Sequence, residues 1–424
     1  GWNFNSERKF LKCPWNQKIL TCSLSPVHVG GKKQLLGFGG EGKHLVITEL
    51  LSSGEVKNRN KNYKNYDYGH TILTILFHPD FSNNQHILIG GYAKTIDIVQ
   101  LKDDNDQSVE CSLIIKLNCE GYIDDVVISP KLRHLQNSRL LVCGGRHMDG
   151  LIIIKYGSKG NYSSFEIEES LSSNCYEKKV SMKLDEDTPC ACSKFIQETT
   201  VRTCCFSRCG NFLAWGGETV PKLFIWEVCS PTNIREYPTN SALYCCAFSI
   251  NSKRIAYSGA SRIVHVRDMQ TGSELYKFEG FDSDVRCCTF IENGEYSSLI
   301  AGGKGGNVRR WTLENKCDGM KIHVFNTNVS PESASSQCAI ACEVSTSVIV
   351  MKSKQSSSAG HIFIRSSHGK VGMLGDANEY SQECIKRKPR VSISSDGECI
   401  AVTCCCSKHQ HPLNIYQRNG NPLT

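Results

Sequence analysis

Cysteine is the residue type with the clearest potential for chemistry in this 424-residue sequence. The chain has 24 cysteines, and several are adjacent, as in Cys204-Cys205, Cys245-Cys246 and Cys287-Cys288. Thiolates bind soft metals and exchange with disulfides. Adjacent residues of a strand point to opposite faces, so neighbouring cysteines do not readily bond to each other. We therefore interpret the thiols as reduced, which is typical of a cytoplasmic or nuclear protein.

These cysteine pairs follow one another at separations of 41 residues (Cys204 to Cys245) and 42 residues (Cys245 to Cys287), which places all three at one register of consecutive units. A ring of such thiols could hold a soft metal. We favour packing instead, because cysteine behaves as a small apolar residue in crowded interiors. Two other ligand-rich tracts also lack the spacing of a closed zinc site: Cys190-Ala191-Cys192 and 404–411. We predict no metal site and no cofactor.

Catalytic motifs are absent from the sequence. It contains no Gly-x-Ser-x-Gly elbow, phosphate-binding loop, His-Glu-x-x-His pair or dinucleotide fingerprint. The Gly-rich segment 302–306 joins two predicted strands, whereas a phosphate loop opens a helix, so we interpret it as a β-turn. We predict no catalytic residues and no enzymatic activity.

Two basic segments are candidate binding sites. Residues 57–68 alternate basic and aromatic side chains, which could hold phosphates and stack on bases, although we favour a solvated loop. Residues 386–390 resemble a nuclear-localisation cluster, although such runs are also common in exposed turns. The candidate partner-binding residues are Lys57, Arg59, Tyr63, Tyr66, Lys386, Arg387 and Lys388.

A repeated pattern of three strand-like runs surrounds these residues. In six units the middle run ends in a pair of small residues, which we call the small-residue pair. The six pairs are Gly39-Gly40, Gly90-Gly91, Gly144-Gly145, Gly216-Gly217, Ser258-Gly259 and Gly302-Gly303. An alternating apolar run precedes each pair and another follows it, and two weaker units occur near residues 341–364 and 391–416. A three-strand unit of about 40 residues cannot bury both of its faces alone, so it needs neighbours stacked beside it.

The units resemble WD repeats over residues 16–418. Gly69-His70 stands where that family has Gly-His, Trp226-Glu227 and Trp311-Thr312 stand where it has Trp-Asp, and Asp268 holds the Asp position. The aspartate that the family usually places before the third strand is missing from the clearer units. The resemblance therefore implies a fold that rests on apolar packing rather than on that aspartate's hydrogen bonds.

We predict an all-β fold, a single closed β-propeller of seven or eight four-stranded blades that spans residues 1–424. The resemblance implies that the N-terminal segment completes the last blade, and Lys9 to Cys13 is the candidate strand. Residues 157–198 are predicted as a long insertion between blades, either a docking arm for a partner or a tolerated surface loop.

The function that these features favour is a non-enzymatic protein-interaction scaffold in a multiprotein assembly. The resemblance implies that other proteins bind one face of the propeller and its long loops. The alternatives are an adaptor that binds RNA or DNA, and a propeller enzyme with its site at the central channel. The net charge of +7 is mild for a chain of this size, which makes nucleic acid the less favoured partner. The sequence has no apolar run long enough to cross a bilayer as a helix and its first residues lack a signal core, so we expect a cytoplasmic or nuclear protein without a membrane span.

Overall fold

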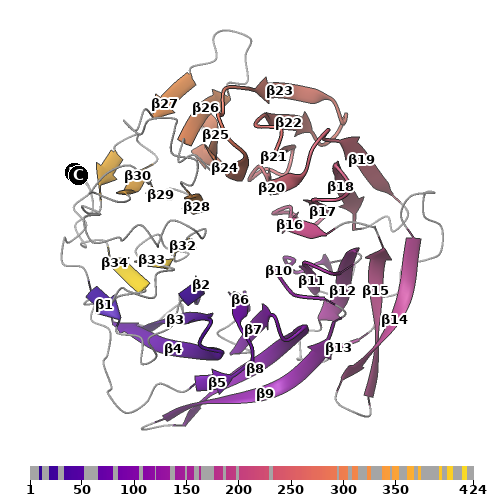
Figure 1. The fold of residues 1–424 in the computed structure, drawn as a ribbon, viewed down its shortest axis with the longest axis vertical. Coiled ribbons are helices and arrows are strands. Elements are labelled where there is room, and N and C mark those ends of the chain that lie inside the picture. The colour runs from indigo at the N-terminus through magenta and orange to yellow at the C-terminus, as the bar shows by residue number, and fades with distance from the viewer. Residues whose placement is uncertain are drawn as a thin grey trace.

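The computed structural model shows the strands of this chain arranged as a ring (Figure 1). Every named element of its described part is a β-strand. The structure describes residues 9–11, 19–26, 33–51, 65–79, 85–104, 108–119, 121–133, 139–148, 150–156, 162–163, 176–184, 188–196, 200–228, 233–293, 296–303, 308–313, 322–325, 337–343, 346–352, 361–366, 371–373, 391–393, 399–403 and 413–417.

The described strands form eight blades, each built on four antiparallel strands counted outward from the channel. The first four blades are β2 (Ile19–Leu24), β3 (Lys33–Gly40), β4 (His44–Leu51) and β5 (Asn65–Asp67); β6 (Ile72–Phe77), β7 (His86–Gly91), β8 (Thr95–Asp104) and β9 (Ser108–Asn118); β10 (Asp125–Ile128), β11 (Arg139–Gly144), β12 (Gly150–Tyr156) and β15 (Thr188–Ile196); and β16 (Val201–Phe206), β17 (Phe212–Gly217), β18 (Lys222–Glu227) and β19 (Ile234–Pro238).

The other four blades complete the ring. They are β20 (Leu243–Phe248), β21 (Arg254–Gly259), β22 (Val264–Asp268) and β23 (Glu274–Phe278); β24 (Val285–Asn293), β25 (Tyr296–Gly303), β26 (Val308–Leu313) and β27 (Ile322–Phe325); β28 (Gln337–Glu343), β29 (Thr346–Lys352), β30 (His361–Ser366) and β31 (Val371–Met373); and β32 (Val391–Ile393), β33 (Cys399–Thr403) and β34 (Leu413–Gln417) with β1 (Lys9–Leu11). The prediction of an all-β propeller is confirmed, with the larger of the two expected blade numbers.

Strand β1 closes the ring from the opposite end of the chain. It pairs antiparallel with β34, with Lys9 opposite Ile415 and Leu11 opposite Leu413. The predicted closing strand therefore lies in the eighth blade over its described residues, while Lys12 and Cys13 lie outside them. The inner strands β2 and β32 also contact each other, so the first and last blades are neighbours. Closure leaves no end blade with an uncovered face.

The predicted insertion 157–198 contains three strands. Strand β13 (Tyr162–Ser163) pairs with β12, and β14 (Tyr176–Leu184) forms a hairpin with β15. Strand β15 runs beside β12 and is the fourth strand of the third blade. Strand β14 also meets β9 at a single pair, Leu184 with Leu117, which joins the second and third blades into one sheet. A docking role for this segment stays a prediction.

The small-residue pairs repeat because two different neighbours approach them. At the first position of the pair, a Cβ on Gly90 would lie 2.6 Å from Ile123, which lies just before the next blade's inner strand. At the second position, a Cβ on Gly91 would lie 2.1 Å from the carbonyl oxygen of Thr71 in the blade's own leading loop. Gly144 meets Val201 in the way that Gly90 meets Ile123. The first residue of the pair thus makes room between blades, and the second makes room within one blade.

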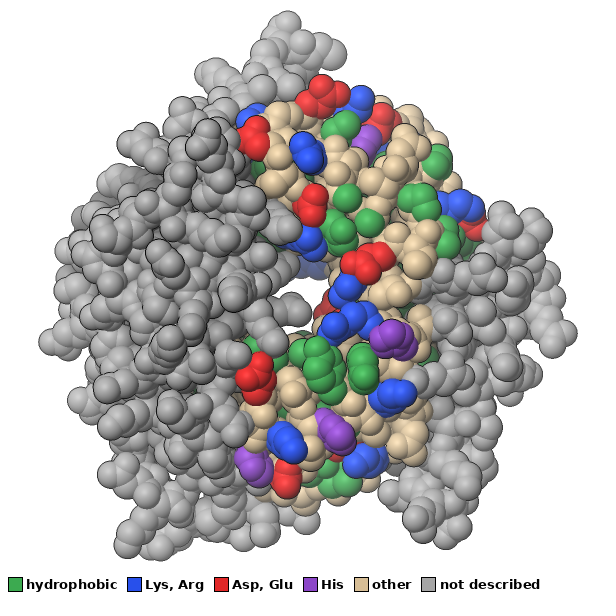
Figure 2. Space-filling view, in the orientation of Figure 1, with side chains coloured by type: hydrophobic (Ala, Val, Ile, Leu, Met, Phe, Trp, Pro, Cys, Tyr) green, Lys and Arg blue, Asp and Glu red, His purple; other side chains and the backbone are tan. Residues whose placement is uncertain are grey.

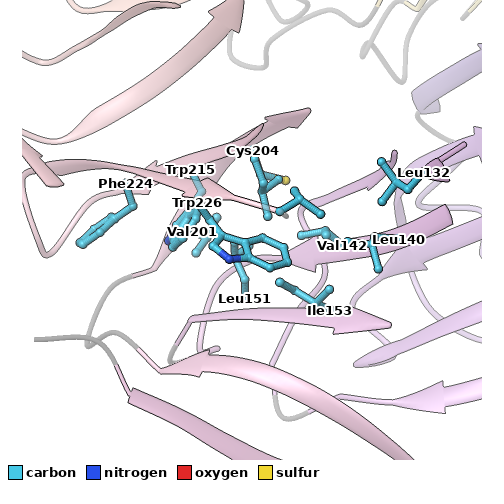
Figure 3. Packing of buried hydrophobic residues seen from close by; sticks show 12 residues of the cluster. Leu132, Leu140, Val142, Leu151, Ile153, Val201, Cys204, Trp215, Phe224 and Trp226 are labelled. Atoms are coloured by element: carbon cyan, nitrogen blue, oxygen red, sulfur yellow. The ribbon is translucent and has the colours of Figure 1, made fainter. Parts of the chain in front are cut away.

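Buried aromatic side chains fill the spaces between blades. Trp226 and Trp215 of the fourth blade lie against Val142, Leu151 and Val201 in one cluster that spans the third and fourth blades (Figure 3). Trp311 fills the matching space after the fifth blade, where its ring stacks on Phe278 at 4.5 Å between centroids. Apolar packing between blades is what the sequence led us to expect.

The cysteine pairs do not share one register, which corrects the prediction. Thr203 pairs with Gly216 as Cys245 pairs with Ser258 and Cys287 with Gly302, so Cys204 corresponds to Cys246. The number of residues between corresponding positions of neighbouring blades is therefore the same from Cys204 to Cys246 as from Cys246 to Cys288. Aligning Cys204 with Cys245 was misleading because it matched cysteines of neighbouring register, which point to opposite faces of the strand.

The described cysteines form no disulfide, and all of them except the exposed Cys209 are buried or partly buried. Cys22, Cys246 and Cys288 each donate to a carbonyl oxygen of the preceding blade, at 3.7 Å to Ala401, 4.0 Å to Ala214 and 3.9 Å to Ala256. Burial raises the pKa of the Cys204 thiol well above its ordinary value, which keeps it neutral at physiological pH. Among the described residues no group of three or more potential ligands is placed to hold a metal. Cys404 to Cys406, His409 and His411 lie outside the described residues, and so do the side chains of Cys190 and Cys192.

Candidate functional site

The candidate site lies at one end of the ring, which we call the loop face. It comprises the turns between second and third strands and the loops that lead into each inner strand, which all lie at the same end because the strands alternate in direction. Figure 2 shows a face of the ring on which basic and acidic side chains lie beside the central opening, with histidines farther out.

A β-bulge at the start of the inner strand recurs in five blades. In the fourth blade, for example, Val201 pairs with Gly217 and Thr203 with Gly216, so Arg202 is the extra residue. An extra residue bends a strand and redirects its own side chain. The five bulge residues are Leu20, Leu73, Arg202, Tyr244 and Arg286.

The five bulge residues differ in side-chain type, whereas the residues directly before them are all of one type. The residue before each bulge is always aliphatic and buried: Ile19, Ile72, Val201, Leu243 and Val285. The bulge itself carries leucine, arginine or tyrosine. Leu20 is buried in the core, whereas Leu73, Arg202, Tyr244 and Arg286 are partly exposed, so in four blades this position presents side chains of different types on a constant backbone.

Arg146 is the centre of a polar cluster on the second, third and fourth blades, which we call the Arg146 cluster. Its Nε and Nη2 donate to both carboxylate oxygens of Asp124 at 3.0–3.3 Å, and Nη2 also donates to the Tyr92 hydroxyl at 3.1 Å. Arg202 reaches the same carboxylate at 3.6 Å and Glu218 at 2.8 Å. A bidentate arginine–carboxylate pair fixes both side chains more firmly than a single contact does.

Aromatic rings extend this cluster, which therefore comprises Tyr92, Tyr122, Asp124, Arg146, His147, Arg202 and Glu218. The rings of Tyr92 and Tyr122 lie 4.8 Å apart, and the His147 ring meets Tyr122 edge-on at 5.4 Å. The Arg146 guanidinium lies over Tyr92 at 5.3 Å from the ring centroid. Partial burial alone would lower the pKa of Arg146, but the bonds to Asp124 and Tyr92 outweigh it and raise the pKa, so the guanidinium stays charged.

A second polar group lies between the fifth and sixth blades. Arg286 pairs with Asp284 at 2.9 Å, and its guanidinium lies 4.0 Å from the Tyr244 ring centroid. The bulge residues Tyr244 and Arg286 of neighbouring blades are thus in contact. In the same way, the bulge residue Arg202 contacts Asp124, which directly precedes the inner strand of the third blade. These contacts hold the side chains in place before any partner arrives, which lowers the entropy that binding would cost.

The residues predicted from sequence are only partly described. Lys57, Arg59, Tyr63, Lys386, Arg387 and Lys388 lie outside the described residues. Tyr66 lies in β5, where it is half-buried, and its hydroxyl donates to the Asp97 carboxylate at 2.6 Å. Desolvation by burial and this bond raise the pKa of Tyr66. This hydrogen bond joins the first and second blades, and a binding role for Tyr66 stays a prediction.

Sequence reasoning missed the Arg146 cluster and the bulge residues. A signal was present, because Arg202, Tyr244 and Arg286 each directly precede the alternating inner-strand run. Without the register, nothing showed that these residues share one position of the blade.

Comparison with known proteins identifies the repeat. Residues 272–312 match the family model described as WD domain, G-beta repeat. The match runs from the turn before β23 through β26 and includes Trp311, so it covers one full repeat of the ring. Residues 272–312 are thus similar to a WD repeat, which is compatible with the resemblance drawn from the sequence. WD repeats suggest a protein-interaction scaffold in general, and such proteins are typically non-enzymatic.

A solved structure shows the same architecture for nearly the whole of this chain. The crystal structure of the computationally designed Ika8 protein superposes with a TM-score of 0.56 at 13% sequence identity, over 95% of this chain and 97% of that one. At this identity the likeness concerns the fold alone. No curated protein sequence matches the chain significantly. Among the described residues, no helix is long and apolar enough to span a membrane.

Proposed function

We propose that this chain is a docking scaffold that binds other proteins on its loop face. The observation that carries the proposal is the recurring bulge, whose backbone is constant while its side chain changes from leucine to arginine to tyrosine. A rigid ring that presents variable side chains at a fixed position is suited to recognition. Arginine and tyrosine are also enriched at the energetic centres of protein interfaces.

The Arg146 cluster supports the same face. Its side chains are oriented by ion pairs, hydrogen bonds and ring contacts, so a partner would meet a preformed surface. The opposite face, where inner strands turn into second strands, carries short turns such as 207–211 and 249–253. Several of their polar groups serve the turns themselves, as when Ser249 bonds Asn251 and the backbone of Arg254.

Crosslinking mass spectrometry on the endogenous complex tests the proposal. A lysine-reactive crosslinker reports on the loop face through Lys43 and Lys94, and on the opposite face through Lys131 and Lys253. We expect links to partner proteins to be concentrated at the first two lysines. Partner links confined to the second two would contradict the proposal.

A pair of variants adds a functional readout. We expect Tyr244→Ala with Arg286→Ala to reduce partner recovery, since the bulge residues would lose their side chains. The control combines Arg133→Ala with Arg208→Ala on the opposite face, where both residues are exposed. Equal recovery by both variants, with unchanged melting temperatures, would place the interface elsewhere.

A further inference from the structure

Three turns of the loop face carry a basic residue in a backbone conformation that favours glycine. Lys43, Lys94 and Arg262 have φ angles of 65°, 59° and 62°. Each stands three positions after the second member of a small-residue pair, in the first, second and fifth blades. All three side chains are exposed.

This conformation is costly for a lysine or an arginine. The left-handed region brings Cβ close to the following carbonyl oxygen, which glycine avoids and asparagine tolerates better than other residues. In the third blade, His147 also has a positive φ of 61° and is exposed. Four strained turn residues at one end of the ring are therefore basic or imidazole side chains. Gln85 and Ser252 on the opposite face also have a positive φ, so what distinguishes the four turns of the loop face is the basic or imidazole side chain that each carries where glycine or asparagine would cost less.

The acidic groups of the same face are engaged, whereas these cations are not. Asp124 pairs with Arg146 and Arg202, Glu218 with Arg202, and Asp284 with Arg286. Lys43 and Arg262 form no ion pair with any described residue. Lys94 lies over the Tyr122 ring at 5.8 Å, a contact that leaves its charge uncompensated. Among the described residues of this face, Lys43, Lys94 and Arg262 are therefore exposed cations that no ion pair neutralises.

From these turns we infer that the loop face binds an acidic protein segment, whose carboxylates meet Lys43, Lys94 and Arg262. The inference rests on the proposed docking function and names the chemistry of its partner. The cations stand on separate blades, so they fit carboxylates spaced along a chain that crosses the ring.

Nucleic acid fits this face less well. The carboxylates of Asp67, Glu218 and Asp284 lie among the cations of the same face, so the cations do not form the continuous basic track that a phosphate backbone follows, whereas separate carboxylates of a peptide can meet them one at a time. The rings of Tyr92 and Tyr122 pack against each other at a tilt of 42°, and the Arg146 guanidinium lies over both, so they do not offer open platforms for bases.

The test is the binding of a fluorescein-labelled Glu-Gly repeat peptide to the full chain, measured by fluorescence anisotropy. A Lys-Gly repeat peptide of equal length is the control probe. We expect the acidic peptide to bind and the basic peptide not to bind. The variant Lys43→Asn, Lys94→Asn, Arg262→Asn should weaken binding by roughly 3- to 150-fold, the effect of losing three exposed ion pairs.

The matched control removes the same charge from the opposite face. Arg133→Asn, Arg208→Asn, Lys253→Asn should leave the affinity within about twofold, since only distant charges change. The loop-face variant should melt at the same temperature as the parent or higher, because asparagine is better suited to a positive φ. Weakened binding with a lowered melting temperature would point to damaged structure and count against the inference.

Other outcomes separate this inference from the proposed function. Equal peptide affinity for both variants overturns the acidic-partner inference, even where crosslinks place partners on the loop face. Partner crosslinks confined to the opposite face overturn the docking proposal itself, whatever the peptide does. Salt-dependent binding of mixed-sequence RNA that the loop-face variant abolishes would replace the acidic segment with nucleic acid.

Discussion

Gly259 is the small residue whose replacement the structure allows us to predict in most detail. The N–H of Ala260 donates to the carbonyl oxygen of Ala242 at 2.9 Å, which folds that carbonyl against Gly259. A Cβ on Gly259 would lie 1.9 Å from this oxygen. In Gly259→Ala the carbonyl must therefore retreat until the two atoms are 3.4 Å apart, the separation at which ordinary contact begins.

Three contributions set the size of the effect. Overpacking of this kind costs about 1–3 kcal/mol. Losing the Ala260–Ala242 hydrogen bond costs about 1 kcal/mol more. The backbone at Gly259 has no positive φ, so alanine returns about 0.4–1 kcal/mol by restricting the unfolded chain. We expect a net loss of about 1–3 kcal/mol in the free energy of unfolding.

Urea unfolding followed by tryptophan fluorescence measures this loss. Trp215 and Trp226 are buried in the preceding blade and Trp311 in the following one, so the signal reports on both neighbours of the altered blade. Gly69→Asn is the matched control, because Gly69 has a φ of 77° and nothing lies within 4 Å of the place that a Cβ would take. If Gly259→Ala changes the free energy of unfolding no more than Gly69→Asn, the explanation of the small-residue pairs is wrong.

Three further substitutions test the packing and the buried polar contacts. Trp226→Ala should lower the free energy of unfolding by about 3–5 kcal/mol in the same urea assay, because it empties the space between the third and fourth blades; a loss below about 1 kcal/mol would contradict that packing. Tyr66→Phe should cost about 1–3 kcal/mol, since it removes a donor from the buried Asp97 carboxylate, and a neutral result would show that water replaces the hydroxyl. Burial lowers the pKa of His86 below its ordinary 6.5, so stability should be complete above that pH and decline as pH falls toward the folded-state pKa, where the unfolded chain takes up the proton first. His86→Gln should flatten this decline in urea titrations between about pH 7 and 5, and an unchanged pH profile would assign it to other groups.

The propeller could be predicted from the sequence because its cause is local and repeated. Each blade needs alternating apolar strands and a small-residue pair, and the pairs mark places where Ile123 or the Thr71 carbonyl approaches closely. The closing strand was also predictable, because a last unit with three recognisable strands needs a fourth. The two ends of the chain supply it as β34 and β1.

The candidate site could not be predicted because it depends on register and on contacts between blades. Nothing near Arg146 in the sequence indicates that Tyr92 and Asp124 meet it from another blade and another loop. The cysteines show that an alignment error of a single residue is enough to hide the site. Aligning Cys204 with Cys245 instead of Cys246 concealed the bulge at Arg202. Tyr66 was predicted as a binding residue only because it lies in the basic and aromatic segment 57–68, whereas in the structure its hydroxyl is hydrogen-bonded to Asp97.

The pairing of β1 with β34 has a consequence for the timing of synthesis. The chain emerges from the ribosome N-terminus first, at roughly 5–20 residues per second, so Lys9 waits about 20–80 s for Ile415. Throughout that interval β1 is a strand without its partner, which would invite association with other nascent chains. It has only three residues and begins with a lysine, and a short, charged strand is a poor template for such association. The brevity of β1 thus suits a segment that is made before the rest of the ring and placed after it.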